Sequence, residues 1–431
     1  MSRQRQVDVH INLNVRGMEP SATVAINELC NAMIEKGQEV YKLGLGQSPF
    51  PVPEPVVEAL RKHAHEKDYL PVKGLRQLRH EVAAYHSRVQ GITGDADDVL
   101  IGPGSKELMF LLQLVYYGDI VIPTPAWVSY APQANIIGRR VRWIHTRRED
   151  DWRLTPDLLE SLCKTDPNRP RIVILNYPSN PTGVSWTTEE LKKLASVARR
   201  FRVVLLSDEI YGELHHRGEH ESIGTLYPEG TIVSGGLSKW CGAGGWRLGT
   251  FMFPRQMRWL LDAMAAVASE TYTSTCAPVQ YAAVTAFRGG QEISLYLERS
   301  RRVLAALGDW CVAKLRGVGV NVLAPAGAFY LFPDFSPLRE RLASRGIEDS
   351  SQLCMRLLED TGVAFLPGSS FGRPASELNA RIAYVDFDGA AALKKVEAMG
   401  AEPVLDEAFL QAFTPNVVHA FELIAEWLEQ P

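Results

Sequence analysis

The sequence has few cysteines, no long apolar run and little net charge. Its six cysteines show neither C-x-x-C pairs nor zinc-site spacing, which indicates free thiols in a reducing cytoplasm rather than a disulfide framework or a metal site. The most apolar helical stretch, residues 108–117, is too short to cross a bilayer, which takes roughly 20 residues. A formal charge of −4 gives no electrostatic reason to expect nucleic acid or a membrane as a partner.

Two signals of other protein classes are also missing. The basic N-terminal segment is followed by no apolar stretch, so we expect no signal peptide. The glycine-rich segments do not match G-x-x-x-x-G-K-[ST], which argues against a nucleotide P-loop.

The length and the apolar pattern predict a two-domain α/β protein. A chain of 431 residues forms about two domains at the usual ~100–200 residues per domain. Before residue 320, apolar β runs alternate with helical patterns, which predicts βαβ crossovers and a mostly parallel sheet covered by helices. These runs read VLIGPGS, DIVIPTP, RIVILNY, RVVLLSD, TIVSGGLS and GTFMFP. After residue 320, β runs between helical segments predict a smaller α+β domain.

Both ends of the chain also predict helices. Ser21 is a suitable N-cap for the helical pattern that follows it, and Gly37 would end that helix. The apolar pattern FTPNVVHAFELIAEWLEQ near the C-terminus predicts a helix that packs on the rest of the chain.

Four chemically useful side chains follow predicted strands. The apolar run in FRVVLLSDEIYGE ends at Asp208, with Tyr211 three residues later. RIVILNYPSNPTG ends in a turn that contains Asn180, and GLSKWCGAGGWRLG carries Lys239 behind a third run. Since open α/β sheets bind ligands at the carboxyl ends of their strands, we expect these four residues to share one site.

This set of groups matches the needs of pyridoxal 5'-phosphate. An acid facing the pyridine nitrogen keeps the ring protonated and able to accept electrons, a role for Asp208. Tyr211 and Asn180 could donate to the ring hydroxyl, and Lys239 could bind the aldehyde covalently. In the same segment, Arg247 could hold the phosphate through its two-pronged guanidinium group.

The motifs NPTG, DEIY, SK and G-W-R-L-G occur here in the order found in a known family. Through them the chain resembles a class I/II aminotransferase (aspartate/aromatic aminotransferase-like) of the fold type I pyridoxal-phosphate family, from about residue 20 to about residue 395. The resemblance implies a large cofactor-binding domain over residues 56–320 with a mostly parallel, seven-stranded sheet. It also implies that residues 1–55 form an N-terminal arm and part of a small domain, which residues 321–431 complete.

The resemblance assigns further cofactor contacts. IGPGSKELMF occupies the phosphate-loop slot, where the amides of Ser105 and Lys106 at a helix N-terminus would bind the phosphate. Trp127 would stack on the pyridine ring. Gly236 stands where many relatives carry a phosphate-binding serine, so Ser238 or Ser234 would have to replace it. Tyr69 in DYLPVKG would reach the phosphate in the partner subunit of a homodimer with shared active sites.

The resemblance also implies how the substrate binds. Arg381, in the β run ARIAYVDF, would grip the substrate α-carboxylate, and the backbone of Gly46 would assist. The segment after Gly46 reads Gln47-Ser48 where the family usually has G-E-P-D-F, which predicts an unusual substrate-side wall. In some aspartate and aromatic relatives a lysine in the slot of Lys106 binds a distal carboxylate. That favours an aspartate-like or aromatic donor, with a 2-oxo acid such as 2-oxoglutarate as acceptor.

The expected reaction is a ping-pong transfer in which Lys239 moves the α-proton and the cofactor carries the amino group between two substrates. The cofactor motifs alone leave two alternatives open, a carbon–sulfur (β/γ) lyase and an aminocyclopropane-carboxylate-synthase-like enzyme. A ligand sensor within a transcription regulator is less favoured, because the segment before Ser21 is too short for a DNA-binding domain. HHRGEH (215–220) resembles the exposed hairpin after DEIY in relatives, so we expect a solvated loop rather than a metal site.

Overall fold

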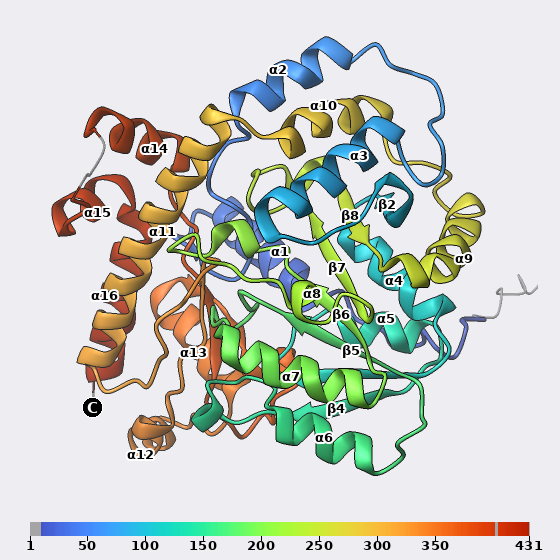
Figure 1. The fold of residues 1–431 in the computed structure, drawn as a ribbon. Coiled ribbons are helices and arrows are strands. Elements are labelled where there is room, and N and C mark those ends of the chain that lie inside the picture. Colours follow the sequence, from blue (N-terminus) through green and yellow to red (C-terminus); the bar gives the residue numbers. More distant parts are fainter. Residues whose placement is uncertain (1–9, 401–403, 431) are drawn as a thin grey trace, which may run out of the picture.

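The computed structural model describes residues 10–400 and 404–430. Its main sheet has seven strands in the order β2-β8-β7-β6-β5-β3-β4 (Figure 1). Strands β3 to β7 run parallel, and β8 is antiparallel to both of its neighbours, which confirms the predicted mostly parallel α/β sheet. The strands are β2 (Val99–Gly102), β3 (Asp119–Thr124), β4 (Val141–His145), β5 (Arg171–Asn176), β6 (Val204–Asp208), β7 (Thr231–Gly236) and β8 (Gly249–Met252).

Helices cover both faces of this sheet, which explains why each central strand contains a continuous apolar run. Alternate side chains of β5 pack in opposite directions: Ile172 and Ile174 join one hydrophobic cluster, whereas Val173 and Leu175 join another. The first cluster includes α4 (Ser105–Val115), α5 (Tyr130–Ile136) and α9 (Arg258–Ser269). The second includes α6 (Pro156–Lys164), α7 (Thr188–Arg200) and α8 (Ile223–Leu226).

The apolar pattern missed one strand of the main sheet, β4. Its sequence, VRWIH, is mixed in polarity, and only Ile144 is buried. The strand lies at the sheet edge and pairs with β3 alone, so it lacks the continuous apolar run by which the central strands were found.

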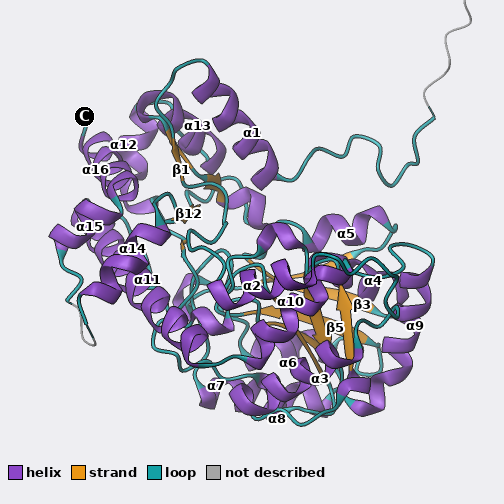
Figure 2. Cartoon of the chain, turned by 90° about the horizontal axis from the view of Figure 1, so that it is seen from above, coloured by secondary structure: helices purple, strands orange, loops and turns teal. Residues whose placement is uncertain are grey.

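Three further helices pack together beside the sheet and share the largest hydrophobic cluster. They are α2 (Glu54–His63), α3 (Arg76–Tyr85) and α10 (Ala277–Arg288), and α10 contacts both of the others. The long helix α11 (Gln291–Gly317) then leads from the sheet toward the C-terminal elements, as both views show (Figures 1 and 2).

The C-terminal elements surround short strands. A three-stranded sheet has the order β11 (Leu366–Pro367), β12 (Ala380–Ala383), β9 (Tyr330–Leu331), and β1 (Tyr41–Lys42) pairs in parallel with β10 (Val363–Ala364). Residues near the N-terminus thus pair with a strand more than 300 positions away. The helices here are α12 (Arg339–Ser344), α13 (Ser350–Thr361), α14 (Gly389–Ala398), α15 (Glu407–Phe413) and α16 (Pro415–Glu429).

The helices predicted at both ends of the chain are present, with one difference. Ser21 is the N-cap of α1 (Ala22–Glu35), but its hydroxyl lies 3.2 Å from that of Thr23 and accepts no backbone N–H. The helix ends two residues before Gly37, whose own N–H donates to the Ile34 carbonyl at 2.8 Å. Helix α16 packs on α11 and α13, as predicted.

Some predicted boundaries extend past the described residues. Residues 1–9 of the predicted N-terminal segment, and residues 401–403 and 431 of the predicted C-terminal segment, lie outside them. Within residues 10–400 and 404–430, no helix combines the length and apolar character needed to cross a membrane.

Candidate active site

A cavity of about 480 Å³ opens at the carboxyl ends of the parallel strands. Strands β5, β6 and β7 are parallel, so all three end at this edge of the sheet. The polar residues at and after the strand ends therefore lie close together there. Residues of α1, of the segment after β1 and of the C-terminal strands complete its wall. Among the predicted site residues, all but Tyr69 and the alternative serine, Ser234, line this cavity: Gly46, Ser105, Lys106, Trp127, Asn180, Asp208, Tyr211, Ser238, Lys239, Arg247 and Arg381.

Lys239 extends from the loop after β7 into the cavity. Its Nζ donates to the Gly46 carbonyl at 2.7 Å and lies 5.7 Å from the centre of the Tyr211 ring. Lys239 forms no ion pair within the described part of the chain. Desolvation, together with the positive charges of Arg381 and Arg247, lowers the pKa of Lys239 to about 8. About a tenth of its amine is therefore neutral at pH 7, and this neutral form is the one that acts as a nucleophile or a general base.

Asp208 is the last residue of β6 and is buried. One carboxylate oxygen accepts a hydrogen bond of 2.5 Å from the Tyr130 hydroxyl, and the other accepts a longer one, 3.4 Å, from Ser234. Burial raises the pKa of Asp208 to about 6, against these hydrogen bonds. No cation pairs with this carboxylate among the described residues, so a positively charged ligand group in the cavity would satisfy it.

The Asn176 side chain braces the turn that carries Asn180. It stands at the end of β5, beside Asp208 in the register of the sheet. Its amide donates to the Asp208 carbonyl at 2.9 Å, and its oxygen accepts from the Asn180 N–H at 2.7 Å. The two strand ends and the turn are thereby held in one arrangement at the cavity wall.

Arg381 is a buried cation without an anionic partner in the described residues. It is 1% exposed, and its guanidinium lies 4.9 Å from the Tyr330 ring centre and 5.0 Å from that of Phe371. It donates to Asn180 Oδ1 at 3.2 Å and to the Gly44 carbonyl, while its Nε has no partner. A buried, unpaired guanidinium is costly, and a carboxylate in the cavity is the ligand that its geometry matches.

A second cationic region lies at the start of α4. Gly104 precedes the helix with φ of +91°, and a Cβ on it would lie 2.1 Å from Arg247 Nη2. A Cβ on Gly249 would lie 2.1 Å from the Ser105 backbone N, so neither position has room for a side chain. The N–H groups of the first turn, the helix dipole and Arg247 together form a site for a phosphate-like anion.

Lys106 faces the same region. Its Nζ lies 5.1 Å from the centre of the Trp127 ring, at the edge of the cavity. Desolvation and the nearby charge of Arg247 lower the pKa of Lys106. Ser238 also lines the cavity, whereas the hydroxyl of Ser234 donates to Asp208. Of the two serines considered as phosphate ligands, Ser234 therefore already uses its hydroxyl proton in a hydrogen bond to Asp208.

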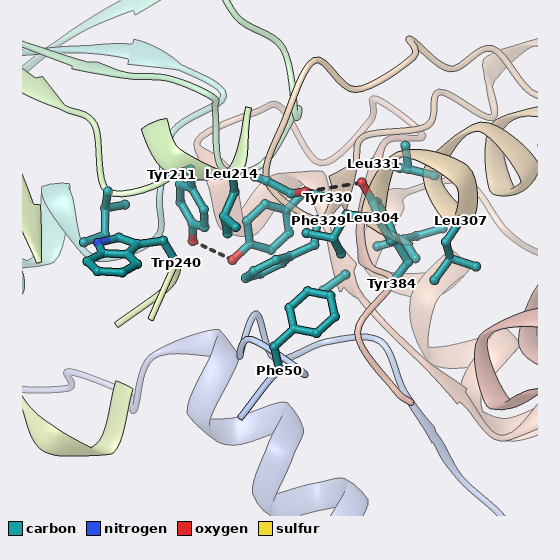
Figure 3. Close-up of a cluster of buried hydrophobic side chains, with 14 of the residues drawn as sticks. Phe50, Tyr211, Leu214, Trp240, Leu304, Leu307, Phe329, Tyr330, Leu331 and Tyr384 are labelled. Atoms are coloured by element: carbon teal, nitrogen blue, oxygen red, sulfur yellow. Dashed lines mark hydrogen bonds between the residues drawn. The ribbon is translucent and has the colours of Figure 1, made fainter. Parts of the chain in front are cut away.

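Two tyrosines of the site were not predicted. Tyr130 holds Asp208, and Tyr330 lies 2.7 Å from the Tyr211 hydroxyl (Figure 3). Tyr130 begins α5, three residues after Trp127 in the preceding loop, so its nearness in the sequence to a predicted site residue was the available signal. Tyr330 lies in a β run whose pattern indicated only a core strand, and nothing local marked it as part of the cavity.

Two predictions concern residues outside the cavity. Tyr69 is 89% exposed in the single chain, so its proposed reach into a partner's site stays a prediction. The prediction of a solvated loop at residues 215–220 is right for 217–219 and wrong for His215, which is buried. His220 also turns inward, with its Nε2 2.8 Å from Glu209 Oε2, because the buried Glu209 carboxylate requires polar partners.

Comparisons with known proteins agree with this geometry. The family aminotransferase class I and II matches residues 38–388. An aspartate aminotransferase of Geobacillus stearothermophilus is 34% identical over 380 residues, which cover 86% of this chain and 93% of that protein. An aspartate/prephenate aminotransferase of Thermus thermophilus is 31% identical, covering 84% and 91% of the two chains. The solved structure of Thermus thermophilus aspartate aminotransferase with maleate aligns with a TM-score of 0.83 and 28% identity, covering 97% of this chain and 100% of that one.

These matches span almost the whole of the predicted resemblance and confirm both the family and its fold. They favour amino transfer over the lyase and synthase alternatives, because these relatives are aminotransferases. The chain therefore belongs to the class I and II aminotransferases, and it is a transaminase.

Proposed function

We propose that this transaminase uses pyridoxal 5'-phosphate, bound in the 480 Å³ cavity. The observation that carries the proposal is the charge pattern of the wall. Asp208, a buried carboxylate without a cation, complements a protonated pyridine nitrogen. Arg247 and the start of α4 complement a phosphate, and Lys239 offers a partly neutral amine to an aldehyde. When bound, pyridoxal phosphate supplies an electron sink for the electrons of a broken Cα–H bond.

The remaining cofactor contacts follow from the same orientation. Tyr211 and Asn180 would face the ring hydroxyl, and Trp127 would cover the ring. The phosphate would be held by the hydroxyl of Ser238, by Arg247 and by the backbone N–H groups of Ser105 and Lys106 at the start of α4. These groups occupy one continuous cavity wall, which supports a single bound molecule rather than several separate ligands.

The chain's own residues would act on the substrate in sequence. Arg381 binds the α-carboxylate and so fixes the direction of the Cα–H bond. Lys239, once its amine is free, takes the proton from Cα and returns one on the cofactor side. Its lowered pKa favours this exchange near neutral pH. The Asp208 carboxylate would stabilise the positive charge of the protonated pyridine nitrogen. The two half-reactions would follow a ping-pong order.

We infer that the amino donor is aspartate and that the acceptor is 2-oxoglutarate. Lys106 supports this choice, because its ammonium group faces the cavity without an ion-pair partner in the described residues. A second substrate carboxylate would give it one. Relatives named for aspartate, and for aspartate and prephenate, support the same class. Gln47, which lines the cavity where the family pattern has glutamate, removes one negative charge from the region where a dicarboxylate would enter.

An absorbance experiment tests the proposed cofactor and donor together. We expect the purified, cofactor-loaded enzyme to show a yellow band that L-aspartate converts to a near-ultraviolet band and that 2-oxoglutarate restores. L-alanine, which lacks the distal carboxylate, should require a concentration at least about tenfold higher, the loss typical of one charge-assisted contact. In Lys106→Met the two amino acids should become nearly equivalent. Aspartate leaving the band unchanged, while another amino acid converts it, would overturn the proposed donor.

We further propose a homodimer in which Tyr69 completes the neighbouring cavity. The motif DYLPVKG supports this proposal, and the 89% exposure of Tyr69 in the single chain leaves its hydroxyl free to reach a neighbouring subunit. Activity per chain should fall when the enzyme is diluted below its dimer dissociation constant, measured by analytical ultracentrifugation beside the assay. Tyr117, which is equally exposed, serves as a control: Tyr117→Phe should leave activity unchanged, whereas Tyr69→Phe should weaken cofactor retention. Full activity in a demonstrated monomer would contradict the shared site.

Two organisational proposals accompany this function. The large cofactor-binding domain would span residues 56–320, and the small domain would combine residues 1–55 with 321–431. The parallel pairing of β1 with β10 supports this division. A cytoplasmic location is supported by six cysteines that are all free thiols.

A further inference from the structure

Tyr330 contacts three parts of the active site at once. Nothing in its sequence context predicted that it belongs to the cavity. Its hydroxyl lies 2.7 Å from the Tyr211 hydroxyl. Its ring lies under the Arg381 guanidinium, 4.9 Å from ring centre to cation. The backbone of Gly46, whose carbonyl accepts from Lys239, passes so close that a Cβ on Gly46 would lie 1.9 Å from the Tyr330 oxygen.

The small sheet explains how Tyr330 reaches Arg381. Strands β9 and β12 are antiparallel, with Leu331 opposite Ile382 and Tyr330 opposite Ala383. Tyr330 is therefore a diagonal neighbour of Arg381 on the same face of the sheet, a separation that aromatic and long side chains can span. Both side chains are buried, so their relative positions are fixed by packing on all sides.

The hydrogen bond between the two phenols determines where the Tyr211 proton can point. Each hydroxyl has one proton and can accept two hydrogen bonds. Within the described residues Tyr211 is the one hydrogen-bond partner of the Tyr330 hydroxyl, and Figure 3 shows the two oxygens facing each other. If Tyr330 donates to Tyr211, the Tyr211 proton remains available for the cavity. The reverse direction would use up the Tyr211 proton and leave the Tyr330 oxygen as a mere acceptor.

We propose that Tyr330 is a positioning residue that donates to Tyr211 and so directs the Tyr211 hydroxyl at the cofactor, while its ring supports the carboxylate-binding Arg381. This inference rests on the proposed pyridoxal phosphate site. It assigns separate tasks to two parts of one side chain. The hydroxyl acts on the cofactor through Tyr211, and the ring acts on the substrate through Arg381. The groups facing Tyr211 are Tyr330, Arg381, Asp208 and Lys239.

The first task predicts a spectroscopic change in Tyr330→Phe. A hydrogen bond donated to the ring oxygen of the cofactor stabilises that oxygen as an anion, so it lowers the pH at which the bound chromophore loses its proton. A weakened Tyr211 donor should therefore raise the chromophore pKa, by about half to one pH unit. Tyr211→Phe should raise it at least as much. In the double variant, Tyr330→Phe should add no further shift, because its effect passes through Tyr211.

The second task predicts a change in carboxylate binding that depends on the ring. Tyr330→Phe keeps the aromatic face, so the dissociation constant of maleate should stay within about twofold of the wild-type value. Tyr330→Leu removes both the hydroxyl and the ring, and it should weaken maleate binding about tenfold. It should also show the same rise in chromophore pKa, so either variant tests the hydroxyl if the other fails to fold. Thermal unfolding shows which variants are folded.

Tyr384 provides a matched control within the same buried cluster. It is fully buried like Tyr330, but its hydroxyl donates to the Ala328 carbonyl at 3.5 Å and is not part of the Tyr211–Tyr330 hydrogen bond drawn in Figure 3. Tyr384→Phe should leave both the chromophore pKa and maleate binding at wild-type values. A wild-type enzyme that shows no chromophore after loading would contradict the proposed cofactor itself. A normal chromophore that titrates identically in wild-type and Tyr330→Phe enzymes would overturn the role of Tyr330 alone.

Discussion

Replacing Lys239 with alanine is expected to reduce amino transfer by at least about 1,000-fold, within the range that a positioned general base contributes. No other amine of the described chain is placed to substitute. The Lys239 Nζ lies over the Tyr211 ring and bonds to the Gly46 carbonyl, whereas Lys106 lies over Trp127 at the cavity edge. The measurement is a single-turnover assay in which the loaded enzyme is mixed with L-aspartate and its absorbance is followed.

The Lys239→Ala protein should still bind pyridoxal phosphate, because Arg247, Asp208 and the start of α4 are untouched. It should lack the absorbance of the lysine-bound cofactor. Lys239→Arg keeps the positive charge without a usable nucleophile and should be equally inactive, which separates chemistry from electrostatics. Lys395→Ala, which changes an exposed residue of α14, should behave as wild type. Near wild-type turnover in Lys239→Ala would contradict the assignment of this lysine as the base.

Replacing Arg381 with leucine is expected to lower kcat/KM for both the amino donor and the oxo acid by about 100- to 1,000-fold. This corresponds to about 3–4 kcal/mol, the usual loss when one partner of a buried charge pair is removed. The reason is that the buried guanidinium has no other anion among the described residues, so the substrate carboxylate is its natural partner. Steady-state kinetics with L-aspartate and 2-oxoglutarate, each varied separately, measure the effect.

Two further variants test whether a loss of kcat/KM is due to the Arg381 guanidinium in particular. Arg381→Lys keeps the charge but loses the two-pronged geometry, and we expect it to recover only part of the lost kcat/KM. Arg356→Leu removes an exposed arginine of α13 that pairs with Asp360 and should leave the kinetics unchanged. Loaded Arg381→Leu should still show the yellow band, since Lys239, Asp208 and Arg247 are unchanged. An unchanged KM for both substrates in this variant would show that the carboxylate binds elsewhere.

The fold was largely predictable because its central strands are apolar on both faces. Runs such as RIVILN and VLLSD are buried under helices on each side. Burial on both faces requires mostly apolar residues, and this composition is what predicted the strands. Their alternation with helical segments then fixes a mostly parallel sheet. Strand β4 escaped detection because an edge strand with solvent on one side needs no continuous apolar run. The short strands of the C-terminal region were visible as β runs, but their pairing was not.

The site was predictable to the extent that its residues follow strands. Asp208, Asn180 and Lys239 each stand just past an apolar run, and strands of a parallel sheet end at a common edge. The residues that hold these side chains in place could not be predicted from the sequence. Tyr130 holds Asp208 from α5, and the inward turn of His220 toward Glu209 contradicts the polar, loop-like composition of its segment.

The sequence by itself determined the α/β class, the edge of the sheet that carries the chemistry, and the residues able to bind an aldehyde, a phosphate and a carboxylate. The class and the sheet edge follow from periodicity, which acts over a few neighbouring residues, whereas the role of Arg381 toward a carboxylate came from the family resemblance. Only the tertiary structure decided which residues orient one another. Tyr211 meets Tyr330 across 119 positions, and Arg381 meets Asn180 across 201. Such contacts depend on how the strands of two sheets come together around the cavity, and no local pattern encodes that.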